Sequence, residues 1–69
     1  MEMQMRNVLV TDLSTQPAPD YLFYLDRSAR FVVVLEDNKK MYEYGRTKEE
    51  AIGKLILANL QEFAIHIVE

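Results

Sequence analysis

Residues 31–51 read FVVVLEDNKKMYEYGRTKEEA, and this stretch decides the fold. Its first five residues form an uninterrupted apolar run rich in β-branched side chains, which predicts a central strand covered on both faces. The polar residues 36–40 predict the tip of a hairpin, and residues 41–44 predict the returning strand, which ends at Gly45. We therefore expect a β-hairpin that leads directly into the next element.

The next element is predicted to be a helix by its capping residues. Thr47 stands where an N-cap belongs, and Glu50 three residues later completes a capping box. Glu49 and Glu50 also place negative charge in the first turn, where the helix dipole favours it. We expect the helix to run from residue 48 to about residue 62.

At about 100° per residue, this helix carries two adjacent apolar stripes. The first consists of Ile52, Leu55, Ile56 and Phe63, and the second of Gly53, Leu57, Leu60 and Ala64. Asn59 falls within the first stripe, where its side chain could bond a backbone group or a partner chain. The stripes cover more of the helix than one sheet hides, so we expect Gly53, Leu57 and Leu60 at an interface between subunits.

Outside residues 31–51 the sequence predicts three further strands, at 7–13, 21–25 and 64–68. The first two are joined by a loop in which Pro17 and Pro19 exclude both helix and ladder pairing. The result is a single α+β domain with the element order β-β-β-β-α-β. Its sheet is expected to be mostly antiparallel, with one helix packed on one face.

Size and composition indicate a small domain that needs support. The chain has 69 residues, 49% of them hydrophobic and 28% charged, as in one globular domain rather than a disordered segment. A chain this short buries only about 60% of the surface that its unfolded form exposes. Without cysteine, and with a single histidine, it lacks the usual disulfide or zinc support. We therefore expect a homodimer or a larger homo-oligomer.

The net charge and the apolar runs limit the kinds of partner and the cellular compartment that we expect. A net charge of −3 exerts no long-range attraction on nucleic acid or an anionic membrane, and it suits a basic protein instead. The longest apolar run is far too short to cross a membrane, and residues 1–6 lack the apolar stretch of a signal peptide. We expect a cytoplasmic protein whose partner is a protein.

One basic-aromatic stretch stands out. It consists of Lys39, Lys40, Tyr42, Tyr44 and Arg46, with Lys48 following. These residues could form a stacking platform for single-stranded nucleic acid, or an edge strand whose charges prevent aggregation. Four positive charges on an acidic chain attract nucleic acid weakly at physiological salt, which favours the second interpretation. The stretch stays a candidate surface for a partner.

Candidate catalytic and metal-binding residues are few. His66 is the only side chain with an ordinary pKa near neutrality, but no nucleophile–base spacing accompanies it. We therefore expect a half-buried structural histidine on the last strand. Asp26, Glu36 and Asp37 could form a carboxylate cluster for a metal, yet they fall in predicted turns, where acidic residues are common. We expect no catalytic residue, no cofactor and no metal site, and a protein that is not an enzyme.

The hairpin and the helix start resemble the small domain of HicB-type antitoxins. Phe31-Val32 fits that family's strand start, and residues 45–51, Gly-Arg-Thr-Lys-Glu-Glu-Ala, fit its helix opening at the same spacing. The resemblance covers residues 21–63, leaves residues 1–20 outside, and departs from the family in the turn at 36–41. It implies a β-β-β-α-β domain, related to an incomplete RNase H-like fold, that commonly dimerises. It also implies a partner, a small basic RNA-cleaving HicA-type toxin that is inhibited by being covered.

Three functions follow from these features. The first is a non-catalytic interaction module of the HicB type that neutralises a toxin by binding it. The second is a small nucleic-acid-binding regulator that uses the basic-aromatic stretch. The third is a metal-dependent nuclease or another hydrolase. The enzyme lacks convergent residues and the regulator lacks positive charge, so the sequence favours the first.

Overall fold

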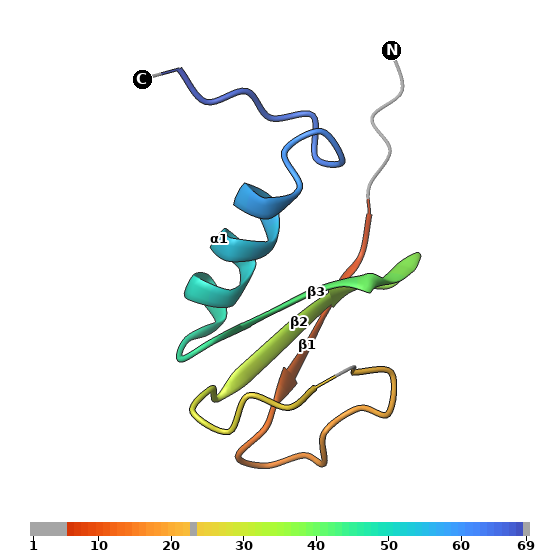
Figure 1. The fold of residues 1–69 in the computed structure, drawn as a ribbon, viewed down its shortest axis with the longest axis vertical. Helices are drawn as coiled ribbons and strands as arrows, with labels where there is room; N and C mark the ends of the chain where they lie inside the picture. Colours follow the sequence, from red (N-terminus) through yellow and green to blue (C-terminus); the bar gives the residue numbers. More distant parts are fainter. Residues whose placement is uncertain (1–5, 23, 69) are drawn as a thin grey trace.

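The protein is an α+β domain with one antiparallel sheet and one helix (Figure 1). This computed structural model describes residues 6–22 and 24–68. Its elements are β1 (Val8–Asp12), β2 (Phe31–Leu35), β3 (Asn38–Gly45) and α1 (Lys48–Ala58). The three strands lie in the order β1-β2-β3, and both neighbouring pairs are antiparallel. The α+β class and the single helix predicted from the sequence are confirmed.

β2 is the central strand, as its apolar run predicted. Val8 pairs with Leu35 and Asp12 with Phe31 on one side, while Phe31 pairs with Gly45 on the other. Residues 32–35 are fully buried. The hairpin tip predicted at 36–40 is too long: the chain turns at residues 36–37, and β3 already begins at Asn38. The pairing of β2 with β3 shifts register between Val34, which pairs with Tyr42, and Leu35, which pairs with Asn38, so residues 39–41 of β3 form an irregularity.

The helix covers one face of the sheet. Val33 and Leu35 of β2 form the core cluster with Ala51 and Leu55 of α1. The partly buried Phe63, which follows the helix, packs against this cluster. Along the sheet, α1 lies over β3 and β2 and leaves the edge strand β1 uncovered. Burial on this face stabilises the fold, since each fully buried Leu or Val contributes about 1.5–3 kcal/mol.

The opposite face is covered by the long connection between β1 and β2 rather than by a strand. The prediction of a strand at 21–25 is wrong for residues 21–22 and 24–25, and residue 23 lies outside the described residues. The physical reason is that β2 has two edges, which β1 and β3 occupy. Tyr24 instead packs on Tyr42 and Tyr44, whose positions opposite Val34 and Val32 place them on this face.

Matching turns close the two ends of this connection. The Asp12 carboxylate accepts hydrogen bonds from the amide N and the Oγ of Ser14, at 3.0 and 2.6 Å. The Asp26 carboxylate accepts the same two bonds from Ser28, at 2.9 and 2.6 Å. These bonds to the charged form lower the pKa of both carboxyl groups. The two turns let the chain leave β1 and enter β2 sharply.

The start of α1 matches the prediction, and its end does not. The Glu50 amide donates to the Thr47 Oγ1 at 3.0 Å, which confirms Thr47 as the N-cap. The Glu50 carboxylate contacts the Lys54 ammonium at 3.1 Å rather than completing the predicted capping box. The helix ends at Ala58, shorter than predicted, because Asn59 caps it: its side-chain amide donates to the Leu55 carbonyl at 2.8 Å.

The segment after the helix forms a turn and then an extended end. Residues 59–64 turn, with Ala64 in the left-handed region at φ 54°, and the Ile65 amide donates to the Leu60 carbonyl at 2.9 Å. The strand predicted at 64–68 is therefore wrong. A strand needs a neighbour, and this turn directs the chain away from both sheet edges (Figure 1). Within the described residues, the structure contains no helix long and apolar enough to cross a membrane.

Candidate interaction surfaces

The aromatic part of the basic-aromatic stretch is used inside the fold. The Tyr42 and Tyr44 rings lie 5.9 Å apart and edge to face, and Tyr24 packs on Tyr44 at 5.5 Å. Tyr44 is only 5% exposed, and its hydroxyl donates to the Tyr24 carbonyl. Burial accordingly raises the pKa of Tyr44. A buried ring cannot stack on a base, so Tyr44 holds the β1–β2 connection against β3.

The basic part of the stretch is spread along β3. The Lys39 ammonium lies 5.4 Å from the centre of the Tyr21 ring, a cation–π contact with the connection. Lys40 is exposed near the hairpin turn, where its amide donates to the Asn38 side chain at 3.3 Å. Arg46 is exposed beyond the other end of β3. The three cations therefore form no single patch, which is the arrangement expected of an edge strand that resists pairing.

A shallow pocket of about 390 Å³ lies beside Arg46, where β3 leads into α1. Its lining carries both signs of charge: Arg46 and Lys54 face Asp26 and Glu50. Lys54 is paired with Glu50 at 3.1 Å. Because the charges balance, the pocket does not select a strongly charged ligand.

Of the three residues predicted to form a subunit interface on the helix, two lie together on one surface. Leu57 is 60% exposed and Leu60 is half-buried, and both line a shallow hollow of about 420 Å³ with Met41 of β3. Gly53 is not among the residues that line this hollow, and a Cβ placed on it would meet no atom within 4 Å. The hollow at the helix end is thus an exposed surface with an apolar rim at Leu57.

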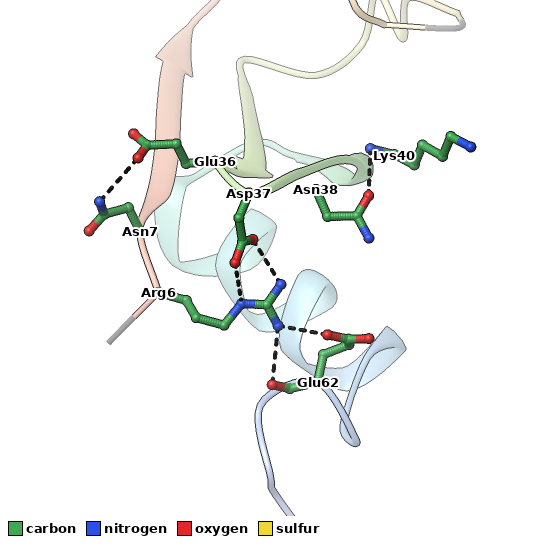
Figure 2. Close-up of polar contacts among 7 residues, drawn as sticks. All are labelled: Arg6, Asn7, Glu36, Asp37, Asn38, Lys40 and Glu62. Carbon is green, nitrogen blue, oxygen red and sulfur yellow. Dashed lines mark hydrogen bonds and ion pairs between the residues drawn. The ribbon is translucent and has the colours of Figure 1, made fainter. Parts of the chain in front are cut away.

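Arg6 joins three segments that are distant in the sequence (Figure 2). Its Nε and Nη2 donate to the two carboxylate oxygens of Asp37, at 3.0 and 2.8 Å. Its Nη1 donates to the Glu62 carboxylate at 2.7 Å and to the Glu62 carbonyl at 3.3 Å. The hydrogen bonds from Arg6 hold the pKa of Asp37 below its ordinary value. The entry into β1 is thereby attached to the hairpin turn and to the segment after α1.

The three carboxylates of the metal-site alternative do not converge. Asp37 binds Arg6, and Glu36 accepts a hydrogen bond from Asn7 at 3.3 Å (Figure 2). Asp26 lies in the Ser28 turn at the start of β2. Among residues 6–22 and 24–68, no group of three or more His, Asp or Glu side chains could hold a metal ion. His66 lies exposed on the extended end, which corrects the prediction of a half-buried histidine on a strand.

Two residues that organise these surfaces were not identified from the sequence. Arg6 binds partners 31 and 56 positions away, and no local pattern indicates such a contact. Tyr24 lies in the aromatic-rich segment 21–25, for which the sequence predicts a strand. In the structure Tyr24 forms no strand and packs its ring on Tyr42 and Tyr44 of β3.

Comparison of the chain with protein-family models, with curated proteins and with solved structures found no match.

Proposed function

We propose that the chain is a non-catalytic protein-interaction module of the HicB type, and that it neutralises a small basic RNase toxin by covering it. The observation that carries this proposal is the junction of hairpin and helix at residues 45–51. The junction supports the resemblance in local structure as well as in sequence, because each of its key residues has a distinct physical task.

Gly45 permits the helix to approach the end of β3. A Cβ on Gly45 would lie 2.5 Å from the Ala51 amide N, closer than any side chain tolerates. Thr47 caps the first turn, and Glu49 and Glu50 place negative charge there. Ala51 is fully buried between the helix and the sheet. Residues 45–51 are therefore a packing device that fixes α1 on the hairpin.

The meander β1-β2-β3 followed by α1 supports the β-β-β-α part of the proposed family domain. The first strand of this meander is β1 at Val8–Asp12, which lies outside the residues that the resemblance covers. The segment after α1 forms no strand among the described residues, so the last element of that domain has no counterpart at 64–68.

Charge supports a basic protein as the partner. The chain carries a net charge of −3, and Glu36, Glu49 and Glu62 are exposed. An acidic surface accelerates the approach of a basic protein and repels nucleic acid. The alternative of a nucleic-acid-binding regulator has weaker support, because Tyr44 is buried and the three cations of β3 are spread out. The proposal further includes self-association and a cytoplasmic location.

Co-expression with the proposed partner, a small basic RNase toxin of the HicA type, tests the proposal. That protein alone is expected to arrest growth, and co-expression of the chain is expected to restore it. Leu57→Asp, at the exposed rim of the hollow at the helix end, is expected to weaken the rescue. Gln16→Asp, which adds the same charge on the β1–β2 connection, is the matched control. Growth that is arrested equally with and without the chain would contradict the proposal.

A further inference from the structure

The outer edge of β1 is defined by its hydrogen-bond ladder with β2. The Leu13 amide donates to the Arg30 carbonyl at 2.7 Å, and the Glu36 amide donates to the Asn7 carbonyl at 3.0 Å. In an antiparallel pair, residues alternate between those that bond the neighbouring strand and those that face away from it. The odd-numbered residues of β1 therefore bond β2, and the even-numbered residues direct their amides and carbonyls outward.

The outward amides and carbonyls of Val8 and Val10 lie along a regular strand edge, and the side chains of this edge are apolar. β1 is the outer strand of the sheet, and β2 is its only neighbour among the described strands (Figure 1). The Val10 side chain is 40% exposed although it lies next to the fully buried Val33, because α1 lies over β2 and β3. An apolar edge without lysine, proline or a bulge is a template for another strand.

The opposite edge of the sheet is protected. β3 carries Lys39 and Lys40 and contains the register shift next to Leu35. Charged side chains and irregular pairing are the features that keep edge strands from associating. The two edges thus differ, and among residues 6–22 and 24–68 no strand pairs with the outer edge of β1.

The side chains along β1 are complementary to a second copy of themselves. On the helix-facing side the strand reads Arg6, Val8, Val10 and Asp12 at alternate positions. An antiparallel copy centred on Leu9 brings Arg6 opposite the second copy's Asp12 and Val8 opposite the second copy's Val10. Each valine then meets a valine, and the charged Arg6 and Asp12, whose side chains already bond Asp37 and Ser14 of their own chain, lie at the two ends of the pairing.

The other side of the strand fits the same register. There Leu9 meets its own copy at the two-fold axis, and Asn7 meets Thr11, so apolar and polar pairs again match. If the centre moves to Val10, Asp12 lies opposite Val8 of the second copy. If it moves to Val8, Arg6 lies opposite Val10 of the second copy. The side chains therefore select one register, centred on Leu9.

We infer that the chain forms a homodimer through antiparallel pairing of two β1 strands about Leu9, which joins the two sheets into one. The outward amide and carbonyl of Val8 bond those of Val10 of the second copy, and the reverse. The dimer buries the exposed Val10 side chain of each copy against Val8 of the other. This inference rests on the self-association in the proposed function and assigns it to β1 rather than to the helix; it does not depend on a toxin partner.

Light scattering of two matched variants tests the interface. The unaltered chain is expected to have twice the 8.1 kDa mass of one chain at micromolar concentration. Val10→Lys places a charge in the proposed interface, opposite Val8 of the second copy, and is expected to give a monomer with an unchanged circular dichroism spectrum. Leu57→Lys, at the exposed end of α1, is expected to stay dimeric. A dimer that survives Val10→Lys but not Leu57→Lys would overturn the β1 assignment and keep self-association; a monomeric unaltered chain would overturn both.

Cross-linking gives a second measurement that does not depend on disrupting the dimer. Because the chain has no cysteine, Leu9→Cys introduces a single thiol. Directly opposed residues have Cβ atoms about 4.5–5.5 Å apart, close enough for a disulfide after small adjustments. Mild oxidation is expected to convert Leu9→Cys almost wholly to a covalent dimer, and to leave Lys40→Cys largely monomeric. Equal cross-linking of the two variants would contradict the register.

Discussion

Gly45 and Ala51 are in contact across the junction of hairpin and helix, and a Cβ on Gly45 would lie 2.5 Å from the Ala51 amide N and 2.9 Å from its Cα. The atoms that such a Cβ would meet belong mainly to backbone, which cannot move aside as a flexible side chain can. The position of α1 on the sheet therefore depends on a glycine at this point of the sequence.

Gly45→Ala is expected to destabilise the protein by about 1–3 kcal/mol, the usual cost of overpacking a close contact. Gly53→Ala is the matched control, since a Cβ there meets no atom within 4 Å and alanine favours a helix. It is expected to stabilise by about 0.5–1 kcal/mol. Urea denaturation measures both. Equal effects of the two substitutions would show that the Gly45 contact is not required.

Thr47→Ala removes the acceptor of the Glu50 amide hydrogen bond at the helix start. We expect a loss of about 1 kcal/mol in the free energy of unfolding. Thr47→Ser retains an Oγ at the same place and is expected to stay close to the unaltered chain. Thermal melts followed at 222 nm compare the three. An unchanged melt for Thr47→Ala would place the start of the helix elsewhere.

Tyr44→Phe keeps the aromatic packing and removes the hydroxyl that donates to the Tyr24 carbonyl. The expected loss of stability is about 0.5–1.5 kcal/mol, that of one hydrogen bond. Because this bond holds the β1–β2 connection, limited proteolysis is expected to cut within residues 13–30 faster than in the unaltered chain. Tyr42→Phe is the comparison within the same ring cluster. Identical cleavage of the Tyr44 variant and the unaltered chain would show that the connection is held by other contacts.

Stability is expected to fall in acid, because folding lowers the pKa of Asp12, Asp26 and Asp37. A carboxyl group of this kind stabilises the folded state fully above its unfolded pKa of about 3.9. That contribution is lost as the pH falls through the lower folded pKa. Asp37→Asn, which removes the anion that binds Arg6, is expected to reduce stability at pH 7 and to flatten the decline below about pH 4.

Asp20→Asn controls for the loss of one negative charge, since Asp20 is exposed on the β1–β2 connection. Chemical denaturation at a series of pH values measures the slopes. A decline in acid that is equally steep with and without Asp37 would contradict the role of the Arg6 contact.

The part of the fold that the sequence predicted well is the part built from neighbouring residues. The apolar run of β2 and the Thr47 cap each act over a few positions, and both occur where they were predicted. The turn after β2 was also predicted, but it occupies residues 36–37 rather than 36–40. The helix end was predicted too late because Asn59 lies within an apolar stripe, and its capping bond to Leu55 outweighs that pattern.

Long-range competition explains the predictions that failed. Residues 21–25 have strand composition, but β1 and β3 occupy both edges of β2, and composition cannot show which strand takes an edge. Residues 64–68 have the same composition and follow a left-handed turn at Ala64 that directs them away from the sheet. The surfaces depend even more on distant pairs, since Arg6 and Glu62 meet only once the chain has folded.

The measurement that tests the proposed function most directly is a titration of RNA cleavage with purified proteins. The proposed partner, a small basic RNase of the HicA type, is mixed with increasing amounts of the chain, and cleavage of a labelled RNA is followed. We predict that cleavage falls to the background level near equal molar amounts, and that the chain alone leaves the RNA intact with and without Mg²⁺. Undiminished cleavage in the mixture, together with metal-dependent cleavage by the chain alone, would contradict the proposal.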